Sequence, residues 1–193
     1  MTNPTPHLFW ITSRAAGTTA MMLSSITVSF GLLMGGKLIK RLGPDRRNIH
    51  EILSLSVIVA IAVHGLALVG DKFLHPNLVD VTVPFASSYK TFATSLGIVA
   101  GWGTIFLGLS YYLRKRIGIE RWKVIHRFTL LVWVAALIHT FSEGTDAGQV
   151  WFTVLMAVTA APAVVLLVVR LGTRQSGAAR PPGRPATATR PSL

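Results

Sequence analysis

The sequence predicts an all-α integral membrane protein: a bundle of five transmembrane helices with the N-terminus outside and the C-terminus in the cytoplasm. Three observations predict it. The 193 residues are 51% hydrophobic and only 13% charged, unlike the composition of a soluble domain. Apolar runs of membrane-spanning length recur along the chain. Most of the basic residues fall on one side of the membrane that these runs define.

Five segments carry almost no charge, and each is expected to form one membrane-spanning helix. About 20 apolar residues cross the hydrocarbon core of a bilayer. Four segments are long enough by themselves, and the fourth in order becomes so if Lys123 and Arg127 extend their charged ends to the membrane surface. The five segments are 15–36, 52–70, 91–113, 128–142 and 147–169.

The basic residues predict the orientation. Of the 19 Lys and Arg residues, 16 lie in the connections and the tail on one side, and only Arg14, Lys72 and Lys90 lie on the other. The positive-inside rule therefore places the basic side in the cytoplasm, and the expected location is the plasma (inner) membrane. The net charge of +12 is explained by this topology. Without a basic soluble domain, it does not indicate nucleic-acid binding.

Composition also predicts the domain boundaries. Residues 1–9 form a short N-terminal segment, residues 10–171 the transmembrane domain surrounded by membrane lipid, and residues 172–193 a basic, Pro/Ala-rich tail that is expected to be disordered. The first residues lack the basic region and the cleavage site of a signal peptide. The first helix is therefore expected to be retained.

Several kinds of chemistry are excluded by the residues that are absent. The chain has no cysteine, which excludes disulfides, thiol catalysis and thiolate-bound zinc or iron–sulfur clusters. No G-x-G-x-x-G unit joins a strand to a helix, so no dinucleotide-binding domain is encoded. No catalytic residues of acid/base or nucleophilic type are expected. The remaining candidates are histidines.

Four histidines lie in two apolar spans or at their ends, and polar side chains in such segments usually mark function. His50 and His64 belong to the second span, and His126 and His139 to the fourth. Separations of 14 and 13 residues correspond to about 20 Å along a helix. Because the two spans run in the same direction, His50 matches His126 near the basic side and His64 matches His139 near the other.

Two imidazoles facing each other suit heme iron better than a bare metal ion. A zinc or copper site normally draws a third histidine, a carboxylate or a thiolate. Heme iron needs only two axial ligands, and a bis-histidine heme favours electron transfer over oxygen binding. Two alternatives stay open: a metal or proton transporter lined by these histidines, and a structural subunit in which they only satisfy the helix packing.

The spacing of the histidines resembles the ferric reductase-like transmembrane domain. The pattern is His, thirteen residues, His on one helix and His, twelve residues, His on the next helix but one. YYLRKRIGIERWKVIHR resembles the basic loop of that family, and FASSYK resembles its outer connection. The resemblance covers roughly residues 10–170. The superfamily includes ferric reductases, the membrane part of NADPH oxidases and the heme subunit of the bacterial methionine sulfoxide reductase system.

The resemblance implies two b-type hemes, an inner one on His50 and His126 and an outer one on His64 and His139. It implies an oxidoreductase membrane subunit that takes electrons from a cytoplasmic flavoprotein or a quinol. The outer acceptor would be ferric iron, oxygen or a partner redox protein. The sequence lacks the cytosolic flavin and nicotinamide domains of larger members, has five spans where many have six, and leaves open whether FMN or FAD binds the inner face.

Heme propionates need cationic or hydrogen-bonding partners. On the basic side, Arg127 is a candidate for this role, and the others near the same level are Arg46, Arg47, Arg121 and Lys123. On the opposite side, Arg14 stands against the charge bias and is expected either to bind a propionate or to snorkel to the surface. The remaining choices there are Lys72, Lys90, Ser87, Ser88 and Tyr89.

The fourth span should be irregular. At about 100° per residue, thirteen residues leave His139 roughly 140° away from the face of His126. We therefore expect a π-bulge, a bend or a wide turn between them, or hemes approached from different directions. Trp133 lies between the two histidines in depth, and Trp102 lies on the third span. Both are expected to serve in packing.

Overall fold

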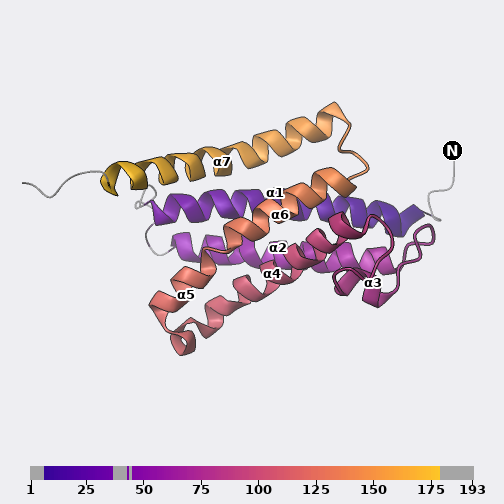
Figure 1. Cartoon of the computed structure of the whole chain (residues 1–193), viewed down its shortest axis with the longest axis horizontal. Coiled ribbons are helices and arrows are strands. Elements are labelled where there is room, and N and C mark those ends of the chain that lie inside the picture. Colours follow the sequence, from indigo (N-terminus) through magenta and orange to yellow (C-terminus); the bar gives the residue numbers. More distant parts are fainter. Residues whose placement is uncertain (1–6, 37–42, 44, 179–193) are drawn as a thin grey trace, which may run out of the picture.

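The computed structural model describes residues 7–36, 43 and 45–178 and shows an all-helical chain (Figure 1). The helices are α1 (Leu8–Gly35), α2 (Asp45–Val69), α3 (Leu78–Thr82), α4 (Thr91–Ile117), α5 (Ile119–His126), α6 (Thr129–Glu143) and α7 (Val150–Ala178). Among the described residues, five segments are long and apolar enough to cross a membrane: α1, α2, α4, α5 together with α6, and the first part of α7. The predicted all-α class is therefore confirmed, with five segments that have the length and apolar composition of membrane spans.

The helices extend beyond the apolar runs that predict them. α1 begins at Leu8 and α2 at Asp45, well before their charge-free stretches. At the other end of the chain, α7 continues to Ala178, past residue 171, where the sequence places the end of the transmembrane domain. Residues 179–193 of the predicted tail lie outside the described residues, as do Lys37, Lys40 and Arg41.

The bundle consists of two helix pairs with a separate helix on one side (Figure 1). α1 packs most closely against α2, and α4 packs against α6. α7 packs on the outer side of α1. Contacts between the two pairs are sparser, since α1 meets α6 and α2 meets α4 over short stretches only. The space between the pairs is where the site is found.

The apolar core lies on the side of α1 that faces α6 and α7. Its buried members are Met21, Trp133, Phe152, Met156, Ala160 and Ala163. Within it, the indole Nε1 of Trp133 donates a hydrogen bond to the Ser25 Oγ at 3.1 Å. The packing role expected for Trp133 is confirmed, because its side chain joins α6 to α1.

The expected irregularity of the fourth span is confirmed at the junction of α5 and α6. α5 ends at His126 and α6 begins at Thr129. The backbone N–H of Arg127 donates to Val124 O at 3.2 Å, and that of Phe128 donates to Ile125 O at 3.0 Å. In both bonds the N–H of a residue donates to the carbonyl three residues earlier, which is the pattern of a tight 3₁₀ turn and not of a π-bulge. Because each such residue advances about 120° and not about 100°, the turn reduces the angle between His126 and His139.

We expect Phe152→Ala to lower the free energy of unfolding by about 3 kcal/mol, because the substitution leaves a cavity where α7 packs on the bundle. Phe152 is 2% exposed. Reversible unfolding in mixed detergent micelles measures the change. Val158→Ala on the same helix is the control, since Val158 is 67% exposed. Equal losses for the two variants would contradict the packing assigned to α7.

Candidate functional site

One large cavity lies between the α1–α2 pair and the α4–α6 pair. Its volume is about 1630 Å³, larger than the range of about 300–1,000 Å³ usual for a single ligand pocket. All four intramembrane histidines line it. The cavity extends from the end of the bundle that carries Arg46 and Arg127, called here the basic end, to the opposite end near Arg14 and Asp146.

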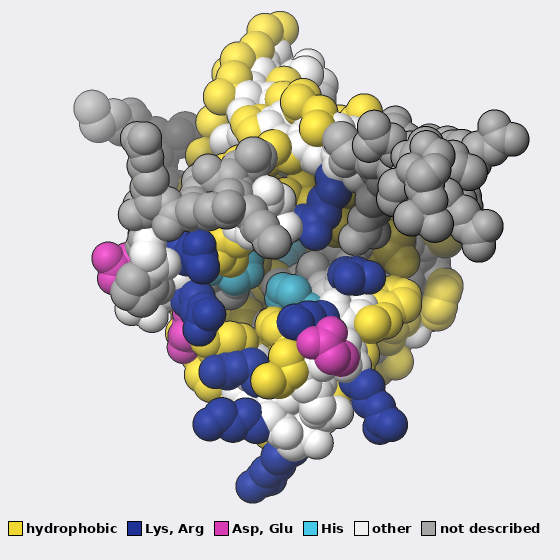
Figure 2. Space-filling view, turned by 90° about the vertical axis from the view of Figure 1, so that its left-hand side faces the viewer, with side chains coloured by type: hydrophobic (Ala, Val, Ile, Leu, Met, Phe, Trp, Pro, Cys, Tyr) yellow, Lys and Arg dark blue, Asp and Glu magenta, His cyan; other side chains and the backbone are white. Residues whose placement is uncertain are grey.

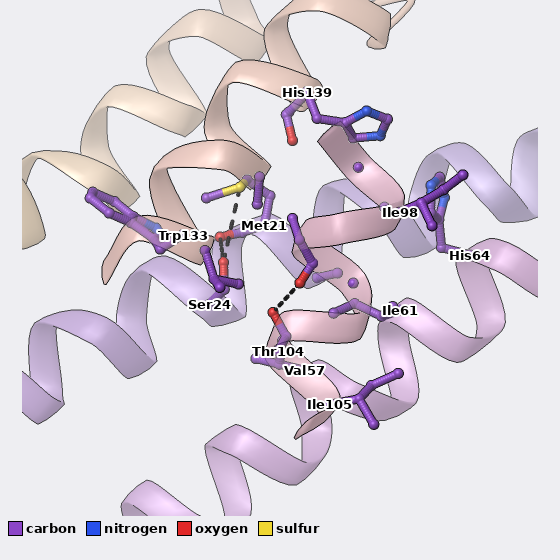
Figure 3. A pocket seen from close by; sticks show the side chains of 18 of the residues that line it. Met21, Ser24, Val57, Ile61, His64, Ile98, Thr104, Ile105, Trp133 and His139 are labelled. Atoms are coloured by element: carbon purple, nitrogen blue, oxygen red, sulfur yellow. Dashed lines mark hydrogen bonds between the residues drawn. The ribbon is translucent and has the colours of Figure 1, made fainter. Parts of the chain in front are cut away.

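His64 and His139 line the cavity toward the opposite end, where Figure 3 shows them on different helices, His64 on α2 and His139 on α6. The Nδ1 of His64 lies 2.9 Å from Ser13 O, and the Nδ1 of His139 lies 2.8 Å from Ala93 O. A carbonyl oxygen can only accept a hydrogen bond, so both Nδ1 atoms carry the proton. The Nε2 atom of each ring is therefore left with a lone pair for a ligand.

Ser13 fixes His64 from α1. Its hydroxyl donates to His64 O at 3.2 Å and lies 3.0 Å from the His64 Nδ1. The side chain of Ser13 is buried, so these bonds are not shared with solvent water. A histidine held by a backbone carbonyl and a hydroxyl has a fixed tautomer and ring orientation, as metal-binding histidines usually do.

His50 and His126 form the pair toward the basic end. Their ring centroids are 6.2 Å apart, with the ring planes at 80°. His50 also stacks on Phe30 of α1, and His126 stacks on Trp122 of α5 at 5.0 Å. The Nδ1 atoms of both histidines are buried and have no hydrogen-bond partner in the described part of the chain. Buried polar atoms of this kind are costly to leave unpaired.

Glycines provide the space in which three of the four imidazoles lie. A methyl group added at Gly17 would lie 2.9 Å from the Nδ1 of His64, and one at Gly31 would lie 3.2 Å from the Cε1 of His50. On α4, a methyl group at Gly97 would lie 2.5 Å from two atoms of the His139 ring. α1 carries no intramembrane histidine, yet it leaves room for both histidines of α2.

Sequence reasoning missed these neighbours of the histidines. It explained Gly31 by general close packing at a helix end, and it did not single out Ser13, Gly17 or Gly97. One signal was available: Gly17 and Gly31 are 14 residues apart, as are His50 and His64. Two adjacent antiparallel helices with equal spacings can bring both pairs into contact. No signal of this kind identifies Ser13.

The structure divides the residues expected near heme propionates into two groups. On the basic end, Arg46, Lys123 and Arg127 line the cavity, whereas Arg47 and Arg121 do not. Toward the opposite end, Arg14 lines it, together with the hydroxyl-bearing residues Ser87, Ser88 and Tyr89. Lys72 and Lys90 are not part of the lining. Arg170 of α7, which was not predicted, also lines the basic end.

Arg14 is neither isolated nor simply extended toward the membrane surface. Its guanidinium forms a bidentate ion pair with Asp146. The Nε donates a hydrogen bond to Oδ2 at 3.0 Å, and the Nη2 donates a second one to Oδ1. It also lies over the Trp10 ring, 4.4 Å from the centroid. Asp146 stands in the connection between α6 and α7, so the pair ties that connection to α1.

The connection before α4 lies at the opposite end of the cavity. Residues 73–89 contribute much of the lining there, and α3 lies across this end in Figure 1. Two bonds anchor the connection to α4. The Trp102 Nε1 donates to Thr82 O at 2.8 Å, and the Phe85 N–H donates to the Ser95 Oγ at 2.7 Å. Trp102 thus supports packing, as expected.

The residues fit bis-histidine hemes. A metal bound at about 2 Å from each of two facing imidazole nitrogens separates the ring centroids by about 6 Å, close to the spacing of His50 and His126. At the other level, both Nδ1 protons are engaged and Nε2 remains for iron. The glycines leave the rings unobstructed, and basic side chains line the end where acidic propionates would need partners.

If the chain binds one heme at each histidine level, Gly97→Ala should leave one heme per chain in place of two, because the added methyl group displaces the His139 ring. Heme per chain, measured from the absorption of the extracted pyridine complex, checks this. Gly103→Ala is the matched control on α4: its methyl group would lie 2.7 Å from Val132, not from a histidine. If both variants keep two hemes, Gly97 has no role in placing His139.

A second expectation concerns the ion pair of Arg14 and Asp146, whose side chains are 35% and 13% exposed. In a double-mutant cycle with Arg14→Gln and Asp146→Asn, we expect a coupling free energy of about 1 kcal/mol for unfolding. The exposed pair of Lys123 and Glu120, at 52% and 85%, should give less than half of that. Equal coupling in both pairs would remove the structural role given to Arg14.

Comparisons with known proteins give no relatives. No family model matches the chain, and no curated protein or solved structure matches it. A function must therefore be argued from the structure alone, that is, from the four histidines, the cavity between the helix pairs and the groups that orient the rings.

Proposed function

We propose that the chain is a di-heme b-type cytochrome of the ferric reductase-like kind, the membrane subunit of an oxidoreductase that moves electrons across the membrane. The observation that supports this proposal most strongly is the arrangement of the four histidines. Two spans each contribute one histidine at each of two levels, and all four line one cavity. Two imidazoles at each level, one from each span, are the minimal protein contribution to a six-coordinate heme.

His50 and His126 would hold the heme near the basic end, and His64 and His139 the second heme. When bound, each heme supplies an iron that alternates between the ferric and ferrous states. The backbone carbonyls of Ser13 and Ala93 orient the rings of the second pair and raise the basicity of their Nε2 atoms. Fixed ligands favour electron transfer, since little has to move when the charge changes.

The lining between the two levels is mostly apolar, and the hydroxyls of Ser24, Ser54 and Thr104 there donate to backbone carbonyls of their own helices. Ile61 of α2 and Ile98 and Ile105 of α4 lie along the cavity in Figure 3. Such side chains exclude water. Exclusion of water keeps the space free of groups that would compete for iron.

A metal-ion transporter is less well supported. Among the described residues, no group of three or more His, Cys, Asp or Glu side chains is placed to hold a metal ion. Zinc and copper sites usually need at least three such ligands. The histidines occur in pairs, as heme requires.

The basic end is proposed to face the cytoplasm of the plasma (inner) membrane, because Lys and Arg are concentrated there. Electrons would then enter near His50 and His126, from a flavoprotein or a quinol, and leave near His64 and His139. Ferric iron, oxygen or a partner redox protein would accept them. The chain's own contribution is to bind and orient the two hemes and to keep them apart from water.

The test is the heme content of paired histidine variants. We expect replacement of His64 and His139 together by Ala to remove one of two hemes, because both axial ligands of one iron are lost, and replacement of His50 and His126 to remove the other. Absorption spectra of the dithionite-reduced protein and heme per chain are measured. His75→Ala is the control, since His75 is exposed in the connection before α4.

Two results would contradict the proposal. One is a purified protein without heme absorption. The other is a reduced spectrum that stays the same when both His64 and His139 are replaced. Stoichiometric zinc or copper without porphyrin would favour the transporter instead.

A further inference from the structure

The two ends of the cavity are built differently. At the opposite end, the connection before α4 lies across the bundle, and two ion-paired groups hold the neighbouring connections. These are Arg14 with Asp146, and Lys90, which donates to Ser142 O at 2.9 Å and lies 3.7 Å from the Glu143 Oε1. The basic end has no such covering segment among the described residues. Figure 2 looks onto that end and shows histidine side chains inside a hollow, with Lys and Arg side chains around it.

Six Lys and Arg residues at this end of the bundle come from three elements, α2, α5 with the turn after it, and α7. We call them the basic rim: Arg46, Arg47, Arg121, Lys123, Arg127 and Arg170. Arg46, Lys123, Arg127 and Arg170 line the cavity itself. Arg47 in the first turn of α2 and Arg121 in the first turn of α5 are not in the lining, and both are exposed.

The membrane topology alone does not require this arrangement. The positive-inside rule needs Lys and Arg in the connections at this end, but it does not need them around the opening that leads to the histidines. Described acidic residues at this end are few: Asp45, Glu51, which accepts from the Tyr112 hydroxyl at 2.6 Å, and Glu120, which accepts from the Lys123 Nζ at 2.7 Å. The rim therefore keeps an excess of positive charge.

Aromatic rings connect the rim region with His126. Trp122 of α5 stacks on His126, with ring centroids 5.0 Å apart and planes at 25°. Tyr111 of α4 meets Trp122 edge-on at 6.0 Å, and the Arg114 guanidinium lies 3.7 Å over the Tyr111 ring. A partner bound at this end would thus be separated from the histidine pair by a few packed rings and not by lipid.

From these observations we infer that the basic rim is the docking surface for a soluble, acidic redox protein that supplies electrons to the cytochrome. The inference rests on the proposed function and selects a soluble protein over a membrane quinol as the donor. At each encounter the partner is oxidised by one electron and the cytochrome is reduced by one, with no covalent bond made or broken. Opposite charges steer such partners together and make the association rate fall with salt.

The experiment uses the full, heme-loaded chain in lipid nanodiscs and an acidic flavodoxin as the probe. We measure flavodoxin binding and the rate of heme reduction by its reduced form, at low and high salt. The test variant is the charge reversal Arg47→Glu with Arg121→Glu, at rim positions outside the cavity. The control is Lys72→Glu, an exposed charge at the opposite end. A flavodoxin with its surface carboxylates amidated serves as the neutral probe.

We expect the rim variant to weaken binding and slow reduction about tenfold at low salt. The Lys72 variant should behave like the unmodified chain, the amidated flavodoxin should bind weakly to all forms, and high salt should remove the differences. Equal binding by the rim variant and the unmodified chain, or no effect of salt, would overturn the inference. A third result would also overturn the inference: flavodoxin does not bind, and a short-chain quinol reduces the heme equally fast in the rim variant and in the unmodified chain.

Dithionite separates failure of this inference from failure of the proposed function. If dithionite produces no reduced heme spectrum in the unmodified chain, the cytochrome proposal itself fails, and the inference with it. If dithionite reduces all variants alike and each holds two hemes per chain, the cytochrome proposal stands. Differences in the flavodoxin measurements then report on the basic rim alone.

Discussion

The structure depends on the separation between the α1–α2 pair and the α4–α6 pair. Four imidazoles line the space between them, and groups on α1 and α4 control how those rings lie. Gly17, Gly31 and Gly97 leave room for the rings, and two backbone carbonyls hold the Nδ1 protons of His64 and His139. If the pairs closed, bulky aliphatic contacts would replace the cavity. The apolar core is accordingly found elsewhere, between α1, α6 and α7.

Much of this architecture could be predicted from the sequence, because the bilayer restricts what an apolar chain can do. Segment length and hydropathy predict the five apolar segments. The separations of 14 residues between His50 and His64 and of 13 residues between His126 and His139 predict that the histidines lie at two depths in the bundle. The azimuthal mismatch in the fourth span required an irregularity, which the turn at Arg127 and Phe128 supplies. The turn is tight, although a π-bulge or a wide turn was also expected. The spacing of His126 and His139 shows that their directions around a regular helix differ, but it does not show which backbone irregularity corrects the difference.

Other parts depend on contacts between distant segments and have no local signature. Asp146 reads as part of a short polar connection, yet it pairs with Arg14. Trp122 reads as one residue of a basic loop, yet it stacks on His126. The distribution of charge was predicted as a topology signal, and only the packed structure relates it to the opening above the basic-end histidines.

The most direct test of the central claim is the heme stoichiometry and spin state of the unmodified chain, purified from membranes and examined by absorption and electron paramagnetic resonance. Four histidines acting as two axial pairs predict two b-type hemes per chain, both low-spin because neither iron has an open position. A heme-free protein, or one high-spin heme with an exchangeable sixth position, would contradict the account. The second result would show that at least one histidine pair serves packing alone.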